Sequence, residues 1–169
     1  MTTSSNAASA ATAPLQRLLA DPAATEALGA ALACAIEPGL QIWLEGDLGM
    51  GKTCLCRGLL RKLDHHGKVK SPTYTLIEPY TLSRLNLYHF DFYRFNSPEE
   101  FLDAGLDEYF AGEGVCVVEW PQKALPYLPP ADLVIRLERA GEGRIAQLDE
   151  NSAAGRTCLN KLIHALPDT

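Results

Sequence analysis

Residues 46–53 read GDLGMGKT, and this octapeptide decides the fold. It matches the pattern GxxxxGK[ST] of a phosphate-binding loop, with an apolar stretch (residues 40–44) before it and a predicted helix (residues 53–63) after it. Glycines let the backbone curl closely enough for several N–H groups to converge on a polyphosphate. We therefore predict a nucleotide-binding site here. The alternative is a glycine-rich turn that caps a helix.

The whole loop is expected to contact the nucleotide. Its residues are Gly46, Asp47, Leu48, Gly49, Met50, Gly51, Lys52 and Thr53. The helix that begins near Thr53 directs its unpaired N–H groups and the positive end of its dipole toward the phosphates. Lys52 is expected to reach the β- and γ-phosphates, and the Thr53 hydroxyl is a candidate ligand of Mg²⁺.

Composition favours one folded unit and disfavours several classes of function. The chain has 169 residues, of which 47% are hydrophobic, so one substantial core is expected. We predict a disordered Ala/Ser/Thr-rich tail over residues 1–14 and a single P-loop domain over residues 15–167. A net charge of −6 and a pI near 5.2 argue against a broad basic face for DNA or tRNA.

Cysteine usage and hydropathy point to the cytoplasm. The five cysteines contain no C-x-x-C pair and have no histidine at zinc spacing, so we interpret them as reduced, mostly buried thiols. Apolar runs are far shorter than the ~20 residues of a membrane span, and the N-terminus lacks the features of a signal peptide. We expect no membrane association.

Hydrophobic periodicity predicts an α/β fold. Helices are expected over residues 22–36, 53–63, 98–103 and 156–166. Strands are expected over residues 40–44, 76–81, 85–90, 114–118, 132–139 and 144–149. The second and third strands form a hairpin, and the last two form another at the edge of the sheet. The fold class is thus a P-loop NTPase-like three-layer sandwich with a mixed, largely parallel sheet and antiparallel hairpins.

A hydroxyl-rich stretch, SPTYTL at residues 71–76, lies directly before a predicted strand. It resembles a segment that senses the γ-phosphate through a hydroxyl near Mg²⁺, with Thr73 or Thr75 as that group. A capped turn is the alternative interpretation.

Acidic residues end two apolar strands, Asp91 in HFDFYR and Glu119 in VVEWPQ. A strand fixes a carboxylate at the sheet edge where ligands bind, so one acid is expected to hold the metal and the other to hold or activate the attacking water. The residues do not say which acid has which role. Asp91 could instead pair with Arg94. Trp120 could shield the phosphates, face a partner, or simply pack on the sheet.

At this point the motifs GDLGMGKT, SPTYTLIEPY, YHFDFYR, PEEF and VVEWPQ, in this order, resemble the TsaE (YjeE) family. The resemblance spans about residues 20–166. It implies a small bacterial ATPase needed to make threonylcarbamoyladenosine in tRNA, binding ATP and Mg²⁺ and acting on the proteins TsaB and TsaD, with tRNA as an indirect partner. Lys52 and Thr53 would hold phosphates and Mg²⁺, Asp91 would be the Walker B-like acid, and Glu119 a second acid near the metal. Arg144 matches a segment near the nucleotide.

Two other functions are compatible with a phosphate-binding loop. A small-metabolite or nucleoside kinase would need an acceptor pocket and an arginine-rich lid, but the arginines here are dispersed. A nucleotide sensor without hydrolysis would need Asp91 and Glu119 to be purely structural.

Overall fold

The structure is a computed structural model that describes residues 13–168. The predicted tail, residues 1–14, therefore lies outside the described residues except for Ala13 and Pro14. The helices and strands follow in chain order: β1 (Leu15–Leu19), α1 (Pro22–Ala33), β2 (Gln41–Glu45), α2 (Lys52–Lys62), β3 (Ile77–Thr81), β4 (Asn86–Asp91), α3 (Glu100–Asp103), η1 (Leu106–Ala111), β5 (Val115–Glu119), η2 (Pro121–Ala124), β6 (Leu133–Ala140), β7 (Gly143–Glu150) and α4 (Ala153–Ala165).

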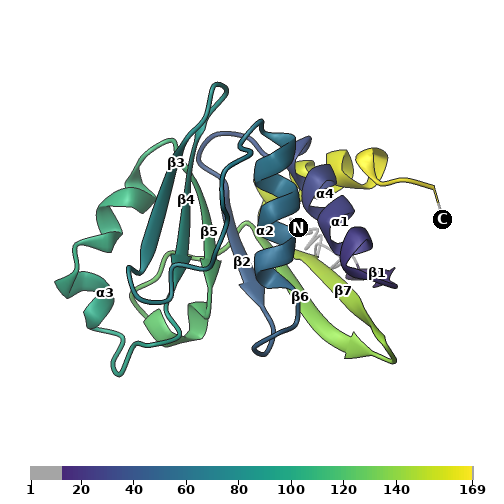
Figure 1. The fold of residues 1–169 in the computed structure, drawn as a ribbon. Helices are drawn as coiled ribbons and strands as arrows, with labels where there is room; N and C mark the ends of the chain where they lie inside the picture. The colour runs from purple at the N-terminus through teal and green to yellow at the C-terminus, as the bar shows by residue number, and fades with distance from the viewer. Residues whose placement is uncertain (1–12, 169) are drawn as a thin grey trace, which may run out of the picture.

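The strands form one seven-stranded sheet in the order β1-β7-β6-β2-β5-β4-β3 (Figure 1). The four central strands, β6, β2, β5 and β4, run parallel, and antiparallel pairs flank them on both sides. The predicted α/β fold with a mixed sheet is confirmed. The first hairpin is also confirmed, as β3 and β4.

The second hairpin is confirmed as β6 and β7, but its expected position at the edge of the sheet is wrong. Strand β6 pairs in parallel with the loop-bearing strand β2, and β7 pairs with a further strand, β1, which forms the true edge. The start of β6 explains its central place, because the run from Leu133 to Ile135 is buried on both faces. The sequence LQRLL of β1 gives little signal, since only Leu19 of it is buried.

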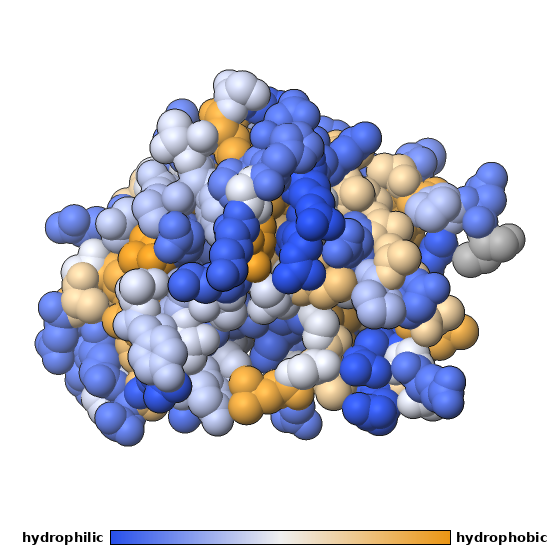
Figure 2. All heavy atoms as spheres, in the orientation of Figure 1, coloured by the Kyte–Doolittle hydropathy of each residue, from blue (hydrophilic) through white to orange (hydrophobic). Residues whose placement is uncertain are grey.

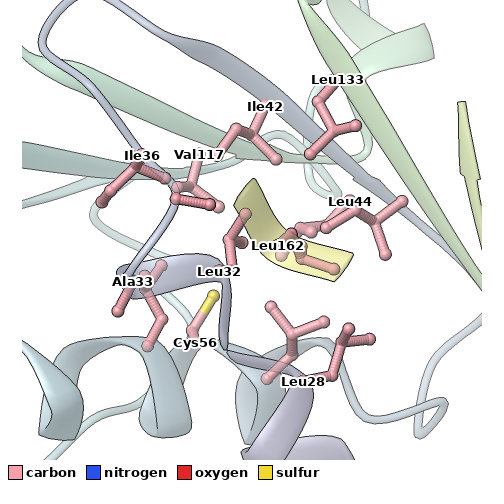
Figure 3. Packing of buried hydrophobic residues seen from close by; sticks show 14 of the residues in the cluster. Leu28, Leu32, Ala33, Ile36, Ile42, Leu44, Cys56, Val117, Leu133 and Leu162 are labelled. Carbon is pink, nitrogen blue, oxygen red and sulfur yellow. The ribbon is translucent and has the colours of Figure 1, made fainter. Parts of the chain in front are cut away.

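Alternate residues of each central strand face different layers. One face packs against α1, α2 and α4 through the larger core cluster, and Figure 3 shows side chains from these helices and from β2, β5 and β6 meeting there. Figure 1 shows α2 lying across the middle of the sheet. Around this helix the surface in the same orientation is predominantly hydrophilic (Figure 2).

The opposite face carries a second, aromatic cluster, which gathers α3, η1 and η2 around Phe90, Phe92 and Phe101. This third layer covers the β3–β4–β5 part of the sheet. Toward β6 and β7, a charged group made of Glu45, Arg136 and Asp149 lies on the sheet instead, with Arg136 2.7 Å from Glu45. The two clusters sandwich the strands that carry the candidate acids.

The four expected helices are all present, but their ends differ from the expected ones by up to three residues: α1 ends at Ala33 and α4 begins at Ala153. The Asp21 carboxylate accepts a hydrogen bond from the N–H of Ala24 at 2.8 Å, which is the predicted cap of α1, and Pro22 occupies the first turn. The helix expected over residues 98–103 is shorter, beginning at Glu100. Among the described residues, helices are too short or too polar to cross a membrane.

Two glycines bring α1 and α2 into backbone contact. A Cβ added at Gly29 would lie 2.1 Å from the carbonyl oxygen of Leu55, and one at Gly58 would lie 2.1 Å from that of Glu26. Both distances are far below van der Waals contact. The position of α2 on the sheet therefore depends on these two residues having no side chain.

Gly58→Ala tests this contact. Alanine in a helix interior usually stabilises by about 1 kcal/mol relative to glycine, but here the methyl group would strike the Glu26 carbonyl. We expect the free energy of unfolding in urea to fall by about 1–3 kcal/mol. Gly112→Ala is the control, because a Cβ there meets nothing within 4 Å. A stability of Gly58→Ala at or above that of the parent protein would contradict the packing.

Candidate functional site

The phosphate-binding loop connects the end of β2 to the start of α2. Gly46 has φ of 146° and Gly51 has φ of 105°, conformations that side-chain-bearing residues rarely adopt. A Cβ at Gly46 would also lie 2.7 Å from the Leu137 carbonyl oxygen on β6. Asp47, Leu48 and Gly49 are exposed at the tip. The predicted strand, loop and helix are therefore confirmed as a structural unit.

Lys52, the first residue of α2, is only 5% exposed. Its ammonium group donates a hydrogen bond to the Gly46 carbonyl and lies 4.2 Å from the centre of the Trp120 ring. Burial lowers the pKa of Lys52, while the negative charges of Glu119, Asp91 and Asp47 act in the opposite direction. The lysine thus bends back over its own loop, close to both candidate acids. Thr53 follows in the first turn of α2 and is half-buried.

Asp91 and Glu119 are neighbours across β4 and β5, because the parallel register pairs them directly. Each is only 3% exposed. Asp91 accepts hydrogen bonds from the Thr73 hydroxyl at 3.2 Å and from the Tyr93 N–H at 2.9 Å. The structure therefore brings the two predicted acids together at one end of the sheet.

Arg94 does not pair with Asp91 in the part of the chain that the structure describes. Its guanidinium group instead lies 4.0 Å from the ring centre of Tyr74, which is 81% exposed. The alternative interpretation of Asp91 as one half of an ion pair with Arg94 is wrong. This arginine connects the loop after β4 to the hydroxyl-rich segment.

Ser71 bridges the two acids and was missed by sequence reasoning. Its hydroxyl lies within hydrogen-bond distance of Asp91 Oδ2 and 2.7 Å from Glu119 Oε2. One hydroxyl proton can serve only one carboxylate at a time. Of the two threonines singled out, Thr73 contacts Asp91, whereas Thr75 is exposed. The hydroxyl-rich segment thus contacts the acids, and its first hydroxyl, that of Ser71, lies between them.

His89 is the second residue that sequence reasoning missed. It is fully buried, and its Nε2 lies 2.8 Å from Glu119 Oε2. Burial alone would lower the pKa of His89, but Cys56 and Glu119 together raise it to about 10. In turn, burial opposes ionisation of Glu119, while His89 lowers the pKa of this carboxyl below its usual value. The available signal was the strand period of two, which places His89 on the same face as Asp91.

Trp120 lies over the lysine in a left-handed conformation, with φ of 57°. Its ring is 4.2 Å from the Lys52 ammonium and 5.0 Å from the ring centre of Tyr93. Such backbone strain in a non-glycine residue is typical of functional sites. Trp120 therefore covers the loop's lysine rather than packing only on the sheet.

Arg144 lies on the other flank of the loop, at the start of β7. Its guanidinium group donates to the Gly49 carbonyl at 3.3 Å. Beside it is a hollow of about 210 Å³ lined by Leu19, Pro22, Thr25 and the loop itself. The predicted turn at Gly143 and Arg144 thus touches the phosphate-binding loop.

The chain is similar to proteins of one family. The family model described as "Threonylcarbamoyl adenosine biosynthesis protein TsaE" matches residues 19–149. The protein of that name from Haemophilus influenzae is 39% identical over 124 residues, covering 73% of this chain and 78% of the relative. Its Bacillus subtilis counterpart is 43% identical over 122 residues, covering 72% and 76%.

A solved structure agrees with the sequence comparisons. The crystal structure of YdiB from Bacillus subtilis superposes with a TM-score of 0.78 and 34% identity, covering 89% of this chain and 95% of that one. The fold is therefore that of a P-loop protein in which a loop lysine, two strand-end acids and a covering tryptophan converge. This chain belongs to the TsaE family, whose members take part in the biosynthesis of threonylcarbamoyladenosine in tRNA.

Proposed function

We propose that this protein binds ATP with Mg²⁺ and hydrolyses it, and that the hydrolysis cycle acts on the TsaB and TsaD proteins during threonylcarbamoyl modification of tRNA. One observation carries the proposal: two buried carboxylates, Asp91 and Glu119, end adjacent strands beside the lysine of a phosphate-binding loop. A site that only bound phosphate would have little use for two negative charges next to it. Glu119 already has His89 beside it, and a bound cation would give Asp91 a positive partner as well.

The oxygen donors present fit Mg²⁺. Carboxylates, hydroxyls and substrate phosphates are its preferred ligands, and it is usually held by one or two carboxylates together with phosphates. Among the described residues, no three His, Cys, Asp or Glu side chains form a ready metal cage. Thr53 with Asp91 or Glu119 would hold the ion once phosphate supplies the remaining ligands. Bound there, Mg²⁺ would neutralise charge on the phosphates.

The protein groups then divide the remaining work. Lys52 would exchange its bond to the Gly46 carbonyl for the phosphates, because a bond between two ionised groups is stronger than one from an ammonium group to a neutral carbonyl. The acid that does not hold the metal would orient the attacking water. Trp120, already in contact with Lys52, would shield the site from solvent. Ser71 and Thr73 would change position when the γ-phosphate is bound or released, because they are hydrogen-bonded to the acids.

The hollow beside Arg144 suits the nucleoside. It opens at Gly49 and Gly51 of the loop, and Leu19, Pro22 and Met50 supply apolar surface for a base. Arg144 at its rim adds positive charge near the phosphates.

The nearby arginines are engaged away from the acids, and this supports a partner-dependent reaction. Phosphoryl transfer needs cations on the transition state, and these are often supplied in trans. Arg84 donates to the Ala33 carbonyl at 2.7 Å on α1, and Arg94 rests on Tyr74. Neither arginine contacts the acids within the described residues. A partner that supplies a cation, or that moves Arg94, would complete the site.

The first test is Lys52→Ala. Removing the loop's cation should lower ATP affinity by about tenfold or more, the loss expected for charge-assisted bonds. Calorimetric titration of ATP with Mg²⁺ measures this directly. Lys62→Ala, an exposed lysine at the other end of α2, should bind like the parent protein. Unchanged affinity in Lys52→Ala would remove the phosphate-site assignment.

Asp91→Asn and Glu119→Gln should each reduce phosphate release by about a hundredfold or more, because each removes a charge that acts on the metal or the water. Both substitutions keep the size of the side chain, and near-UV circular dichroism checks the fold. Asp149→Asn is the matched control, a carboxylate on β7 that lies 3.8 Å from Arg136. If either site variant hydrolyses ATP at the parental rate, that acid is structural.

Partner dependence is tested by steady-state phosphate release from the protein alone and with TsaB and TsaD. We expect stimulation of at least about tenfold, with about 10³- to 10⁵-fold as the known range for a charge supplied in trans. Acceptor phosphorylation is followed in the same reactions. Equal rates of phosphate release with and without the partners would remove the partner-driven mechanism. Transfer of the γ-phosphate of ATP to a nucleoside or small metabolite would favour the kinase.

A further inference from the structure

His89 is the one fully buried titratable side chain of the site that the proposed reaction does not yet use. It lies on β4 two residues before Asp91, with its side chain against α2. Its Nε2 is 2.8 Å from Glu119 Oε2 and 3.8 Å from the Cys56 sulfur, whereas its Nδ1 has no hydrogen-bond partner. All its polar contacts therefore converge on one nitrogen.

The strand register explains how His89 reaches the acid. His89 is opposite Val117 on β5, two residues before the Asp91 and Glu119 pair along the strands, and it is fully buried. It therefore approaches the Glu119 carboxylate from the buried side, while Ser71 approaches the same Oε2 at 2.7 Å. Because an ionised carboxylate can only accept, the proton in the 2.8 Å contact between His89 and Glu119 belongs to Nε2 of His89.

The contacts of Glu119 fall on one oxygen and not on the other. Oε2 accepts from His89 and lies within reach of the Ser71 hydroxyl, which Asp91 shares, whereas Oε1 accepts none among the hydrogen bonds of the described residues. A carboxylate anchored in this way cannot rotate freely about its last bond. One oxygen is fixed, and the other is left for a ligand.

We infer that His89 is a positioning residue for Glu119, whose Nε2–H anchors one carboxylate oxygen so that the other is presented to the metal or the attacking water. This inference rests on the proposed function. Ligand-orienting bonds of this kind commonly change metal affinity or activity by about 10- to 100-fold when they are removed.

Space filling is the competing explanation, and it makes a different prediction. A buried polar group without a complete set of partners is costly, so an apolar residue of similar size would fill this space at least as well. If His89 only filled space, the His89→Leu variant would hydrolyse ATP at the parental rate. Variants with a polar amide at this position would then hydrolyse ATP more slowly than His89→Leu.

The test compares amides of two lengths at one position. The side-chain nitrogen of Gln can occupy the place of Nε2, whereas that of Asn reaches only the place of Nδ1. We expect His89→Gln to stay within about threefold of the parental kcat, and His89→Asn and His89→Leu to lose about 10- to 100-fold in kcat with KM for ATP little changed. Cys56→Ala, which alters the weaker contact to the same nitrogen, should change kcat less than about twofold.

A double substitution shows whether His89 acts through Glu119. Added to Glu119→Gln, His89→Leu should cause no further loss of kcat beyond about twofold, since residues that act as a unit are not additive. Thermal melts confirm that each variant is folded. Independent losses that multiply, failure of Gln to rescue, or a parental kcat in His89→Leu would each overturn the inference.

A second readout does not require turnover. Mn²⁺ binding in the presence of ADP, followed by electron paramagnetic resonance, should weaken about tenfold or more in His89→Leu and recover in His89→Gln. Equal Mn²⁺ affinity in the parent and His89→Leu would overturn the inference and leave the proposed function intact. A parent protein that binds no Mn²⁺ with ADP would overturn both.

Discussion

The site depends on placing two carboxylates side by side in a nearly dry environment. Asp91 and Glu119 are paired in register on adjacent strands, and each is 3% exposed. Neighbouring strands of a sheet lie about 4.8 Å apart. Burying one charge without a partner is costly, and burying two of the same sign is more so. The surrounding groups each reduce that cost: Lys52 and His89 supply positive charge, and Ser71 and His89 supply hydrogen bonds. The arrangement is suited to receiving a cation.

The protein core is what keeps these groups in place. Lys52 is the first residue of α2, so the position of this helix sets the position of the lysine. Helix α2 lies close to α1 because Gly29 and Gly58 allow the two helix backbones to touch. The loop reaches β6 through Gly46, where even a methyl group would meet the Leu137 carbonyl. Packing on one face of the sheet thus fixes the distance between the loop's cation and the strand-end acids.

Much of the site could be predicted because its signals are local. The loop motif is contiguous, and an acid at the end of an apolar strand can be recognised from a few residues. Lys52, Asp91 and Glu119 could therefore be named as candidates, and the structure brings them together. Ser71 and His89 were missed because their roles come from contacts across the sheet. The same reason explains the misplaced hairpin: strand order is set by pairing between distant segments, and nothing within residues 132–149 says that β6 lies beside β2 or that β1 covers β7. For His89 the period of two was an available clue.

We propose that Asp91 and Glu119 share one metal and phosphate site with Lys52. A crystal structure of the protein with Mg²⁺ and a non-hydrolysable ATP analogue tests it most directly. We predict phosphates inside the loop, Lys52 moved from the Gly46 carbonyl to those phosphates, and Mg²⁺ in direct or one-water contact with Thr53 and with at least one of the two acids. Phosphates outside the loop, or a metal ion remote from both acids, would contradict the account.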